Sequence, residues 1–599
     1  AEQSEPPTGG PFKWAARRGT GYDGKKTVVS GPVHHRGVPL EREAPMTEEC
    51  IRQQIVSCDL PPAIQKRRDA WLLAANVENL SQKDLLEKLT VCAERSVELF
   101  KLYGFSVGNY QVTNTVARWN RQIQGCPNPF GPLTWIKFMK ATILRYYLYL
   151  TQQPDECSGL VFLQKPEDSF LLGKPIRFLR MMKRTDPEKY ESFCESVLIG
   201  LKGSFPRPCG EALKQAVLDW RASIFGGESL PVDEKFSLYL EGQLKDLFGT
   251  CKADLVKFQT DITFPTFSST KTHGRKWGGG AGAFLAEASK PNSPLNDANL
   301  PDLRLSADIG SCEVEPVDGS FGWTEEEFVR FNSLHAKKDY TKCLEFAMLE
   351  AFGNESDEVD PVALKEALKV RLITRGPFWR NFVCNALMIQ LRSFLKKLPC
   401  FVLTGKEIET SDIRNFLSDK PIVSGDYRAA TDNLASWVSL KIADILCETY
   451  FSDLTKVYPH LQQILRNGLC GFTFRGDSMV LGQLMGSTAS FPVLCLANYA
   501  LCRYSMLENP RDWPKTLLIN GDDCSFHANS ACKAKWELTG RAIGLSPSPG
   551  KCFHQVGRVQ MNSRSFRFSD GEWQKIPLFL LGIAYGCKRS EDDSGRSAG

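Results

Sequence analysis

The stretch that decides the fold of this chain is Leu517-Leu518-Ile519-Asn520-Gly521-Asp522-Asp523-Cys524-Ser525-Phe526. Two apolar runs meet here at Asn520-Gly521, and an Asn-Gly pair between apolar strands is a strong short-range signal for a β-hairpin. Two adjacent acids, Asp522 and Asp523, stand at the tip, where one hairpin can present both to a cation. A surface turn with two solvated acids is the alternative, so a second acidic element is needed to indicate a site.

The second acidic element is Pro421-Ile422-Val423-Ser424-Gly425-Asp426, which reads as a short strand that ends in an acid. A helical face follows it at three- and four-residue spacing: Leu434, Trp437, Val438, Lys441, Ile442, Ile445 and Leu446. Asp432 and Asn433 lie at the turn between strand and helix, where helix N-capping is their ordinary structural role. The two elements together would gather three carboxylates, the hard oxygen ligands that a pair of Mg²⁺ ions requires.

A segment rich in small residues, Gly482–Pro492, lies between the two acidic elements. Small residues let a backbone approach a ligand closely. Ser490 can cap a helix with Pro492 in its first turn, and the run Val493–Cys502 is apolar all round, which predicts a buried helix. A glycine loop before a core helix is the alternative, and it accounts for the shape of the segment without a ligand.

Positive charge is concentrated in residues 361–400. This stretch holds eight lysines and arginines against one acid, a local charge of +7 in a chain of net charge +5. Aromatic and aliphatic residues interrupt the basic ones, which favours a structured basic surface that holds phosphates over a solvated helix face. The basic residues are Lys365, Lys369, Arg371, Arg375, Arg380, Arg392, Lys396 and Lys397.

The composition is that of a globular protein, with 42% hydrophobic and 24% charged residues. No apolar run is long enough to predict a membrane span, and no secretory leader is recognisable at the N-terminus. The cysteines are scattered singly, which indicates free thiols in a reducing compartment. The sequence contains neither a P-loop nor an H-E-x-x-H motif, so a P-loop NTPase and a zinc peptidase of that kind are excluded.

The expected fold class is α+β, with five regions along the chain. Residues 1–45 are expected to be a flexible basic tail, and residues 46–300 a mainly helical region. A break at residues 268–301 reads as a flexible linker, with a template-gripping loop as the alternative, and a helical stretch is expected from there to Cys400. Residues 421–570 form a mixed region with an antiparallel sheet, and residues 571–599 a short C-terminal segment and tail.

Taken in order, these segments resemble the palm motifs of RNA-directed RNA polymerases from positive-strand RNA viruses. The residues of these motifs are most similar to those of polymerases from the ourmia-like viruses (botourmiaviruses), relatives of the narnaviruses. Ser424–Asn433 looks like motif A, Met485–Leu494 like motif B and Asn520–Asp523 like motif C. Lys369–Gly376 is similar to motif F, Pro549–Lys551 occupies the place of motif D, and Met561–Arg564 is similar to the strand of motif E that supports the primer end.

The resemblance implies a right-hand fold, with an N-terminal and fingers region in residues 46–300, fingers with motif F in 301–420, a palm in 421–570 and a small or incomplete thumb in 571–599. It implies a nucleotidyltransferase in the host cytoplasm that uses two Mg²⁺ ions, for which Mn²⁺ can substitute. The metal and catalytic ligands would be Asp426, Asp522 and Asp523, with Lys551 as general acid. The remaining implied roles are nucleotide binding by Lys369, Arg371, Arg375, Asp432, Asn433 and Ser490, and template or primer binding by Gly486 and Ser487.

The chain departs from the family pattern in two places. Many relatives carry an Asn eight residues after the motif B glycine, where this chain has Leu494, so ribose selection would fall on Asp432, Asn433 and Ser490. The segment after motif E is too short for a full thumb, so the thumb is minimal, or the N-terminal region or another viral or host protein completes the ring. RNA template, nascent RNA and ribonucleoside triphosphates are the implied partners, and DNA is not.

Two other functions compete with RNA synthesis from RNA. A reverse transcriptase shares the two-metal palm but usually has an aromatic steric gate five residues after the motif A acid, where this chain has Thr431. A non-catalytic RNA-binding replication factor would have three acids in motif order either by coincidence or because it retained them after losing its activity. A primed RNA template, Mg²⁺ and either rNTPs or dNTPs distinguish all three.

Overall fold

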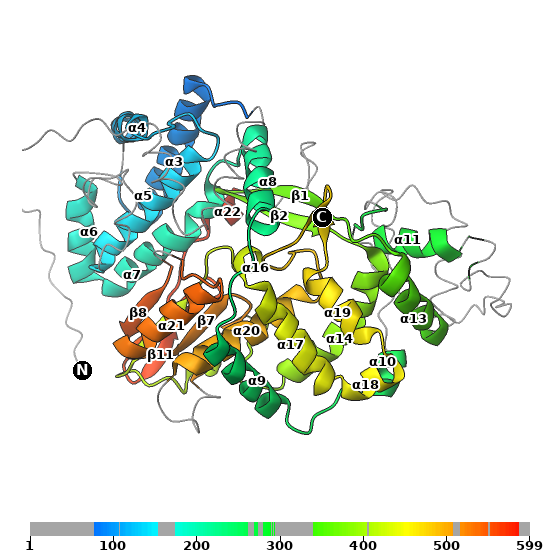
Figure 1. Cartoon of the computed structure of the whole chain (residues 1–599). Helices are drawn as coiled ribbons and strands as arrows, with labels where there is room; N and C mark the ends of the chain where they lie inside the picture. The colour runs from blue at the N-terminus through cyan, green and yellow to red at the C-terminus, as the bar shows by residue number, and fades with distance from the viewer. Residues whose placement is uncertain are drawn as a thin grey trace, which may run out of the picture.

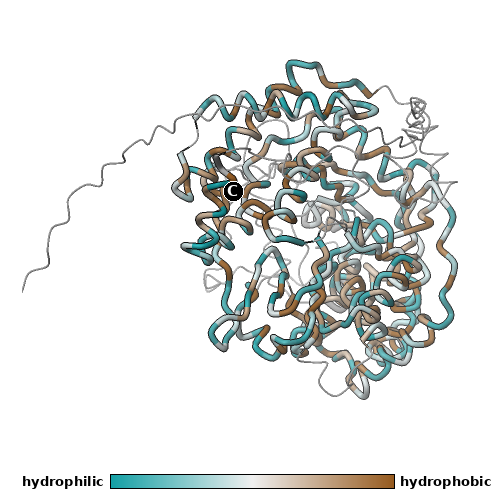
Figure 2. Tube along the Cα trace, turned by 90° about the vertical axis from the view of Figure 1, so that its left-hand side faces the viewer, coloured by the Kyte–Doolittle hydropathy of each residue, from teal (hydrophilic) through white to brown (hydrophobic). Residues whose placement is uncertain are grey.

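The computed structural model of the chain describes residues 77–106, 108–153, 174–260, 269–273, 279–288, 290, 293, 340–403, 407–506, 516–548 and 551–585. The expected basic tail at residues 1–45 and the polar end at 591–599 lie outside these residues. Helices are combined with antiparallel strands, so the α+β fold class is confirmed (Figure 1). Hydrophobic and hydrophilic positions alternate along many of the helices, as helices with one buried face require (Figure 2).

The first part of the described chain is a layer of helices, which we call the N-terminal helical layer. It comprises α3 (Gln82–Leu102), α4 (Asn109–Gln124), α5 (Thr134–Thr151), α6 (Lys174–Thr185), α7 (Pro187–Glu195), the π-helix η2 (Ser196–Gly200) and the 3₁₀-helix η3 (Lys202–Ser204). Side-chain caps define two of its starts, because Ser81 accepts from Asp84 N and Asp186 from Lys189 N. Its buried side chains form a hydrophobic cluster that also takes in Phe553 and Leu581 from the far end of the chain.

The central sheet has four antiparallel strands in the order β6-β7-β3-β8. They are β3 (Pro421–Gly425), β6 (Leu517–Asn520), β7 (Asp523–His527) and β8 (Phe553–Val556). The strand ending in an acid and the hairpin are therefore both confirmed, and they are neighbours in this sheet. The β3–β7 register pairs Gly425 with Cys524, so Asp426 follows β3 at the edge where Asp523 begins β7.

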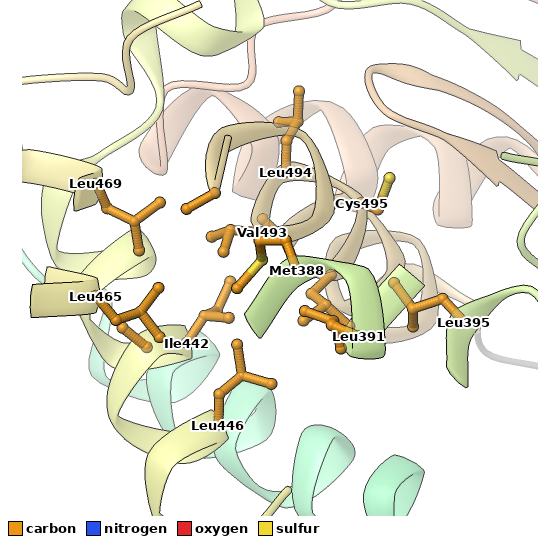
Figure 3. Close-up of a cluster of buried hydrophobic side chains, with 14 of the residues drawn as sticks. Met388, Leu391, Leu395, Ile442, Leu446, Leu465, Leu469, Val493, Leu494 and Cys495 are labelled. Carbon is orange, nitrogen blue, oxygen red and sulfur yellow. The ribbon is translucent and has the colours of Figure 1, made fainter. Parts of the chain in front are cut away.

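A helical core covers this sheet. Its main helices are α14 (Phe378–Leu395), α17 (Ser436–Glu448), α19 (Leu461–Cys470) and α20 (Ser490–Ser505), and α20 is buried along almost its whole length, as its apolar run predicts. Figure 3 shows aliphatic and sulfur side chains from these four helices meeting: Met388, Leu391, Leu395, Ile442, Leu446, Leu465, Leu469, Val493, Leu494 and Cys495. The other described helices of this part are α8 (Gly210–Phe225), α9 (Glu234–Phe248), α10 (Leu255–Thr260), α13 (Tyr340–Leu349), η6 (Glu350–Asn354), α15 (Thr410–Ile413), α16 (Ala430–Asn433), α18 (Ser452–Val457) and α21 (Ser530–Ala542).

A β-hairpin corrects the expectation of a continuous helical stretch up to Cys400. Strands β1 (Asp360–Glu366) and β2 (Lys369–Arg375) pair from Asp360↔Arg375 to Glu366↔Lys369. The alternation of basic and apolar or β-branched residues in β2 has the period of a strand, and the helical interpretation overlooked it. The two-residue turn ends in Leu368, whose positive φ of 54° is held because its side chain is buried in the N-terminal helical layer.

The expectation of a flexible linker at residues 268–301 is wrong for the residues that the structure describes there. Helix α11 (Gly279–Ala288) packs Phe284 into the main core beside Trp379, with ring centroids 6.1 Å apart. Lys271 N donates to Gly376 O at 3.1 Å, and its ammonium pairs with Glu358 at 2.6 Å. Residues 274–278 and 294–301 lie outside the described chain, so the alternative of a template-gripping loop stays untested.

The C-terminal strands pack against the N-terminal helical layer. Strands β9 (Arg558–Met561), β10 (Arg564–Ser569) and β11 (Glu572–Lys575) form a three-stranded sheet, followed by α22 (Leu581–Ala584). Glu195, fully buried at the end of α7, forms an ion pair with Arg558 and accepts from Ser565 Oγ at 2.6 Å. The two short β4 (Thr473–Phe474) and β5 (Asp477–Ser478) strands lie apart from these sheets. No helix in the described ranges is long and apolar enough to cross a membrane.

Candidate active site

The β6–β7 turn carries two acids and packs against helix α20. The turn residues are Gly521 and Asp522, one position later than the Asn-Gly pair that the sequence indicated, because Asn520 still pairs with Asp523. Gly521 has a φ of +65°, and a Cβ there would lie 2.9 Å from the Phe491 ring, so both conformation and space require glycine. Its N–H donates to Cys495 Sγ at 3.2 Å.

Asp426 and Lys551 are held together at the same edge. After β3, residues 426–428 no longer pair with β7 and pair with residues 546–548 instead. Ser548 N donates to Asp426 O at 2.8 Å. Lys551 N donates in turn to Ser548 O at 3.1 Å. This path brings the Lys551 ammonium onto the Asp426 carboxylate as an ion pair. Residues 549 and 550 lie outside the described chain.

The three acids share an excess of negative charge. Burial, followed by the charge of Asp426, raises the pKa of Asp522. Burial and the charges of Asp426 and Asp522 raise the pKa of Asp523 to about 7. Burial works against the charge of Lys551, but the nearby Asp426 raises its pKa above the ordinary value. Among the described residues no group of three or more His, Cys, Asp or Glu side chains is arranged to hold a metal ion. The donor chemistry nevertheless fits one, because clustered, desolvated carboxylates lack positive charge.

Two asparagines outside the sequence-derived site orient the acidic turn. The turn of motif E reaches Asp523, whose Oδ2 accepts from Asn562 N at 3.2 Å. Asn562 Oδ1 accepts from Asn520 Nδ2 at 2.7 Å, which ties that turn to β6. On α20, the buried Asn498 donates to Gly521 O at 2.9 Å and accepts from the Tyr427 hydroxyl at 2.7 Å. Asn498 on α20 therefore joins Tyr427, next to Asp426, to the acidic turn through buried hydrogen bonds.

Sequence reasoning missed Asn498 although a signal exists. A single amide inside the apolar run Val493–Cys502 must find buried partners, which predicts a structural bond to a neighbouring element.

The predicted phosphate-binding residues lie on β2. Lys369, Arg371 and Arg375 alternate along the strand, so their side chains share one face of the hairpin. Arg371 is held by Glu366 at 2.9 Å, whereas Arg375 approaches Asp360 only at 3.8 Å. Lys369 is close enough to Asp522 for that charge to influence its pKa, which burial nevertheless lowers overall. Of the three basic residues of β2, Lys369 is therefore the one that the structure links to the acidic turn.

Arg380 does not belong to the basic surface that residues 361–400 were expected to form. Only 2% of it is exposed, and it forms an ion pair with Asp357 and donates to Gly471 O at 3.2 Å. Its position in the first turn of α14, a buried helix, directs it inward. This arginine therefore stabilises the helical core and cannot contact phosphate on a surface.

Asp432 and Asn433 occupy the short helix α16 rather than a capping position, so the expected N-cap role is wrong. The N-cap residues of α16 and α17 are Ala429 and Ala435. The Asn433 amide donates to Arg428 O at 3.0 Å. Asp432 accepts a weak 3.4 Å bond from Thr431, and burial raises its pKa to about 6. Its carboxylate is therefore half-buried and poorly satisfied.

The small residues of motif B have close protein contacts of their own. A Cβ on Gly486 would lie 1.8 Å from Thr374 O, so glycine allows this segment to pack on β2. Ser487 donates to Gly468 O at 2.5 Å and Ser490 to Leu484 O at 2.7 Å.

Two further expectations about motif B can be compared with the structure. Ser490 is the first residue of α20, and the N-cap is Ala489, so the expected Ser490 cap is wrong. Leu494 belongs to the hydrophobic core, 3% exposed, so the position that carries an Asn in many relatives is a core position here (Figure 3).

The antiparallel sheet therefore gathers acids from the end of β3 and from the β6–β7 turn near the basic β1–β2 hairpin. Comparison with known proteins finds a similar viral polymerase. The chain is 34% identical over 260 residues to the RNA-dependent RNA polymerase of Ourmia melon virus (isolate Melon/Iran/VE9). The match covers 38% of this chain and 30% of the relative, so the chain spans less than a third of that protein's length. No family model matches the chain. The resemblance to ourmia-like virus polymerases is confirmed over the matched part.

Proposed function

We propose that this chain is an RNA-directed RNA polymerase that replicates the genome of a positive-strand RNA virus by template-directed nucleotidyl transfer. The observation that carries the proposal is the juxtaposition of Asp426, Asp522 and Asp523, drawn from two elements distant in sequence, beside the cationic face of β2. Its similarity to a viral RNA-dependent RNA polymerase supports the same activity.

Asp426, Asp522 and Asp523 would hold two Mg²⁺ ions, with Mn²⁺ as a substitute. When bound, such ions lower the pKa of the attacking hydroxyl and neutralise phosphate charge. The raised pKa of Asp523, about 7, supports this role, because a carboxylate short of positive charge gains most from a cation. Asn562 fixes the orientation of that carboxylate through its backbone N–H.

The chain's own cations would handle the triphosphate. In the reaction the primer 3′-oxygen would form a bond to the α-phosphorus, the bond from that phosphorus to the pyrophosphate oxygen would break, and the hydroxyl proton would pass to solvent water. Lys369, Arg371 and Arg375 would offset the negative charge of the triphosphate, and an arginine fork suits phosphate oxygens well. Lys551 would donate a proton to the leaving pyrophosphate, and its raised pKa keeps it protonated for that step.

RNA template, nascent RNA and ribonucleoside triphosphates are the proposed partners. Base pairing would supply sequence choice, so the protein needs to recognise only backbone and shape. The N-terminal helical layer contacts β9 and β10 through Glu195 and is a candidate for the role of the thumb. A further viral or host protein is the other candidate. The host cytoplasm is the proposed location.

The test is elongation of a primed RNA template by the purified chain in Mg²⁺, with either rNTPs or dNTPs, and with or without other viral proteins. RNA synthesis from rNTPs alone is the expected result. Efficient use of dNTPs would indicate a reverse transcriptase. RNA binding without any elongation, in the presence of the other viral proteins, would indicate a non-catalytic replication factor.

A further inference from the structure

Two lysines of the N-terminal helical layer come close to the acidic turn and belong to no motif. Lys140 lies on α5, and Lys202 is the first residue of η3. Electrostatic coupling links their ammonium groups to each other and to Lys551. Lys140 is also coupled to Lys369, and Lys202 to Asp426. Lysines from four separate elements therefore converge on one place beside the acids.

The segment that carries Lys202 is locked by close backbone contacts. It follows the π-helix η2, an irregularity that is often found at functional sites. A Cβ on Gly200 would lie 1.9 Å from Phe579 O, and one on Gly582 would lie 2.6 Å from the Gly203 carbonyl carbon. The chain end thus fixes the position of η3. Four residues further on, Pro206 O accepts a 3.5 Å bond from Leu368 N at the tip of the β1–β2 hairpin, next to Lys369.

Helix α5 directs Lys140 to the same region. Tyr147, two turns later on the same face of α5, packs edge-on against Phe553 with ring centroids 5.8 Å apart. Phe553 is two residues beyond Lys551 and begins β8, so this face of α5 lies against the strand that follows Lys551. Most residues of α5 are buried, whereas Lys140 and Lys137, one turn earlier, are exposed. An exposed ammonium on such a helix faces an opening rather than a packed core.

The cluster lacks anions to match it. Neither Lys140 nor Lys202 forms an ion pair within the described part of the chain. Desolvation by the surrounding protein, followed by the charges of the neighbouring lysines, lowers the pKa of each ammonium to about 8 although neither side chain is enclosed, so each is destabilised in its charged form. A fixed cluster of like charges that costs stability is expected where an anionic ligand offsets it.

We propose that Lys140 and Lys202 bind the β- and γ-phosphates of the incoming nucleotide and the pyrophosphate that leaves, so that the N-terminal helical layer supplies part of the triphosphate site. The inference rests on the proposed function. A polyphosphate places several charges on adjacent phosphorus atoms, which matches converging ammonium groups. An RNA backbone carries one charge per nucleotide along a line, which matches a basic stripe instead.

The test uses the full chain with Lys140→Ala, Lys202→Ala and the double variant, and titrates inorganic tripolyphosphate by calorimetry in metal-free buffer. Each single variant should weaken tripolyphosphate binding about tenfold, or about 1.4 kcal/mol. Lys202→Arg, which keeps the charge, should recover most of the affinity. Lys83→Ala, an exposed lysine on α3, is the matched control and should bind like the wild type.

Kinetics and stability complete the test. Both variants should raise KM for rNTPs, and the inhibition constant of pyrophosphate, more than they lower kcat, with RNA affinity unchanged. Their melting temperatures should not fall, because each loses a repelling charge. Unchanged tripolyphosphate binding by the double variant, or a loss of RNA affinity in its place, overturns the inference. Because this binding is measured without catalysis, an inactive wild type refutes the proposed polymerase activity separately.

Discussion

Asp432 offers the sharpest prediction. Burial disfavours the charge of its carboxylate, and the carboxylate accepts one weak hydrogen bond, from Thr431. Burial raises its pKa to about 6, above the value of about 3.9 expected in the unfolded chain. An acid with a raised folded-state pKa favours folding most at low pH, and this contribution is lost as the pH rises through about 6. At pH 8 the ionised Asp432 therefore destabilises the protein relative to pH 4.

The size of the effect follows from the shift. Two pKa units correspond to at most about 3 kcal/mol, and partial exposure to solvent reduces this to about 1 kcal/mol. Asp432→Asn removes the titration, so its melting temperature should exceed that of the wild type by about 1–3 °C at pH 8, and the two should converge below about pH 4, where the carboxyl is protonated in the folded chain and largely so in the unfolded chain. Asn433→Ala is the matched comparison, since its lost bond to Arg428 does not titrate.

Selectivity is the functional half of the prediction. If Asp432 accepts a hydrogen bond from the ribose 2′-hydroxyl, Asp432→Ala should narrow the rNTP/dNTP ratio of kcat/KM by roughly 5- to 150-fold, the range for a buried group left unpaired. Asp432→Asn keeps an acceptor oxygen and should change the ratio less. An unchanged ratio in the folded Ala variant, with the pH-dependent stability gain intact, would show that Asp432 is merely a buried acid and remove it from the site.

Three further predictions follow from particular contacts. Glu195→Gln should lower the free energy of unfolding by about 3–5 kcal/mol in chemical denaturation, because it leaves buried Arg558 uncompensated, whereas the exposed Glu188→Gln should cost at most about 1 kcal/mol. Arg375→Ala should raise KM for rNTPs while RNA affinity keeps most of its salt dependence; an unchanged KM would assign β2 to the template. Mg²⁺ should raise the melting temperature more at pH 8 than at pH 6, where Asp523, of pKa about 7, is largely protonated. Asp523→Asn should reduce that shift, and an equal shift in the variant would contradict the ligand assignment.

The elements whose pattern lies within a short stretch of sequence could be predicted. The hairpin at residues 517–526 and the strand ending at Asp426 have alternating or apolar patterns bounded by turn residues, so period and turn chemistry agree. The β1–β2 hairpin was not predicted. The basic residues of β2 indicate a charged surface, and the same residues also recur with the two-residue period of a strand. Its tip contains Leu368 at positive φ, a conformation that only distant packing explains.

The site could be predicted only where its residues follow a motif. Asn498 acts through neighbours that are remote in sequence, Gly521 and Tyr427, and no spacing along the chain links it to the acids. Arg380 shows the opposite error, since a basic residue in a basic segment became a buried partner of Asp357. Tertiary packing decides these cases, and local pattern does not.

The central claim is that the three acids support RNA synthesis. The measurement that tests it most directly compares elongation of a primed RNA template by the wild type, by Asp522→Ala and by Asp453→Ala. Asp453 is a partly exposed acid on α18 that pairs with Lys456. We expect the wild type and Asp453→Ala to extend the primer in Mg²⁺. Asp522→Ala should bind RNA with unchanged affinity and add no nucleotide, because it loses cation binding and no phosphate contact. Near-normal elongation by Asp522→Ala would contradict the account.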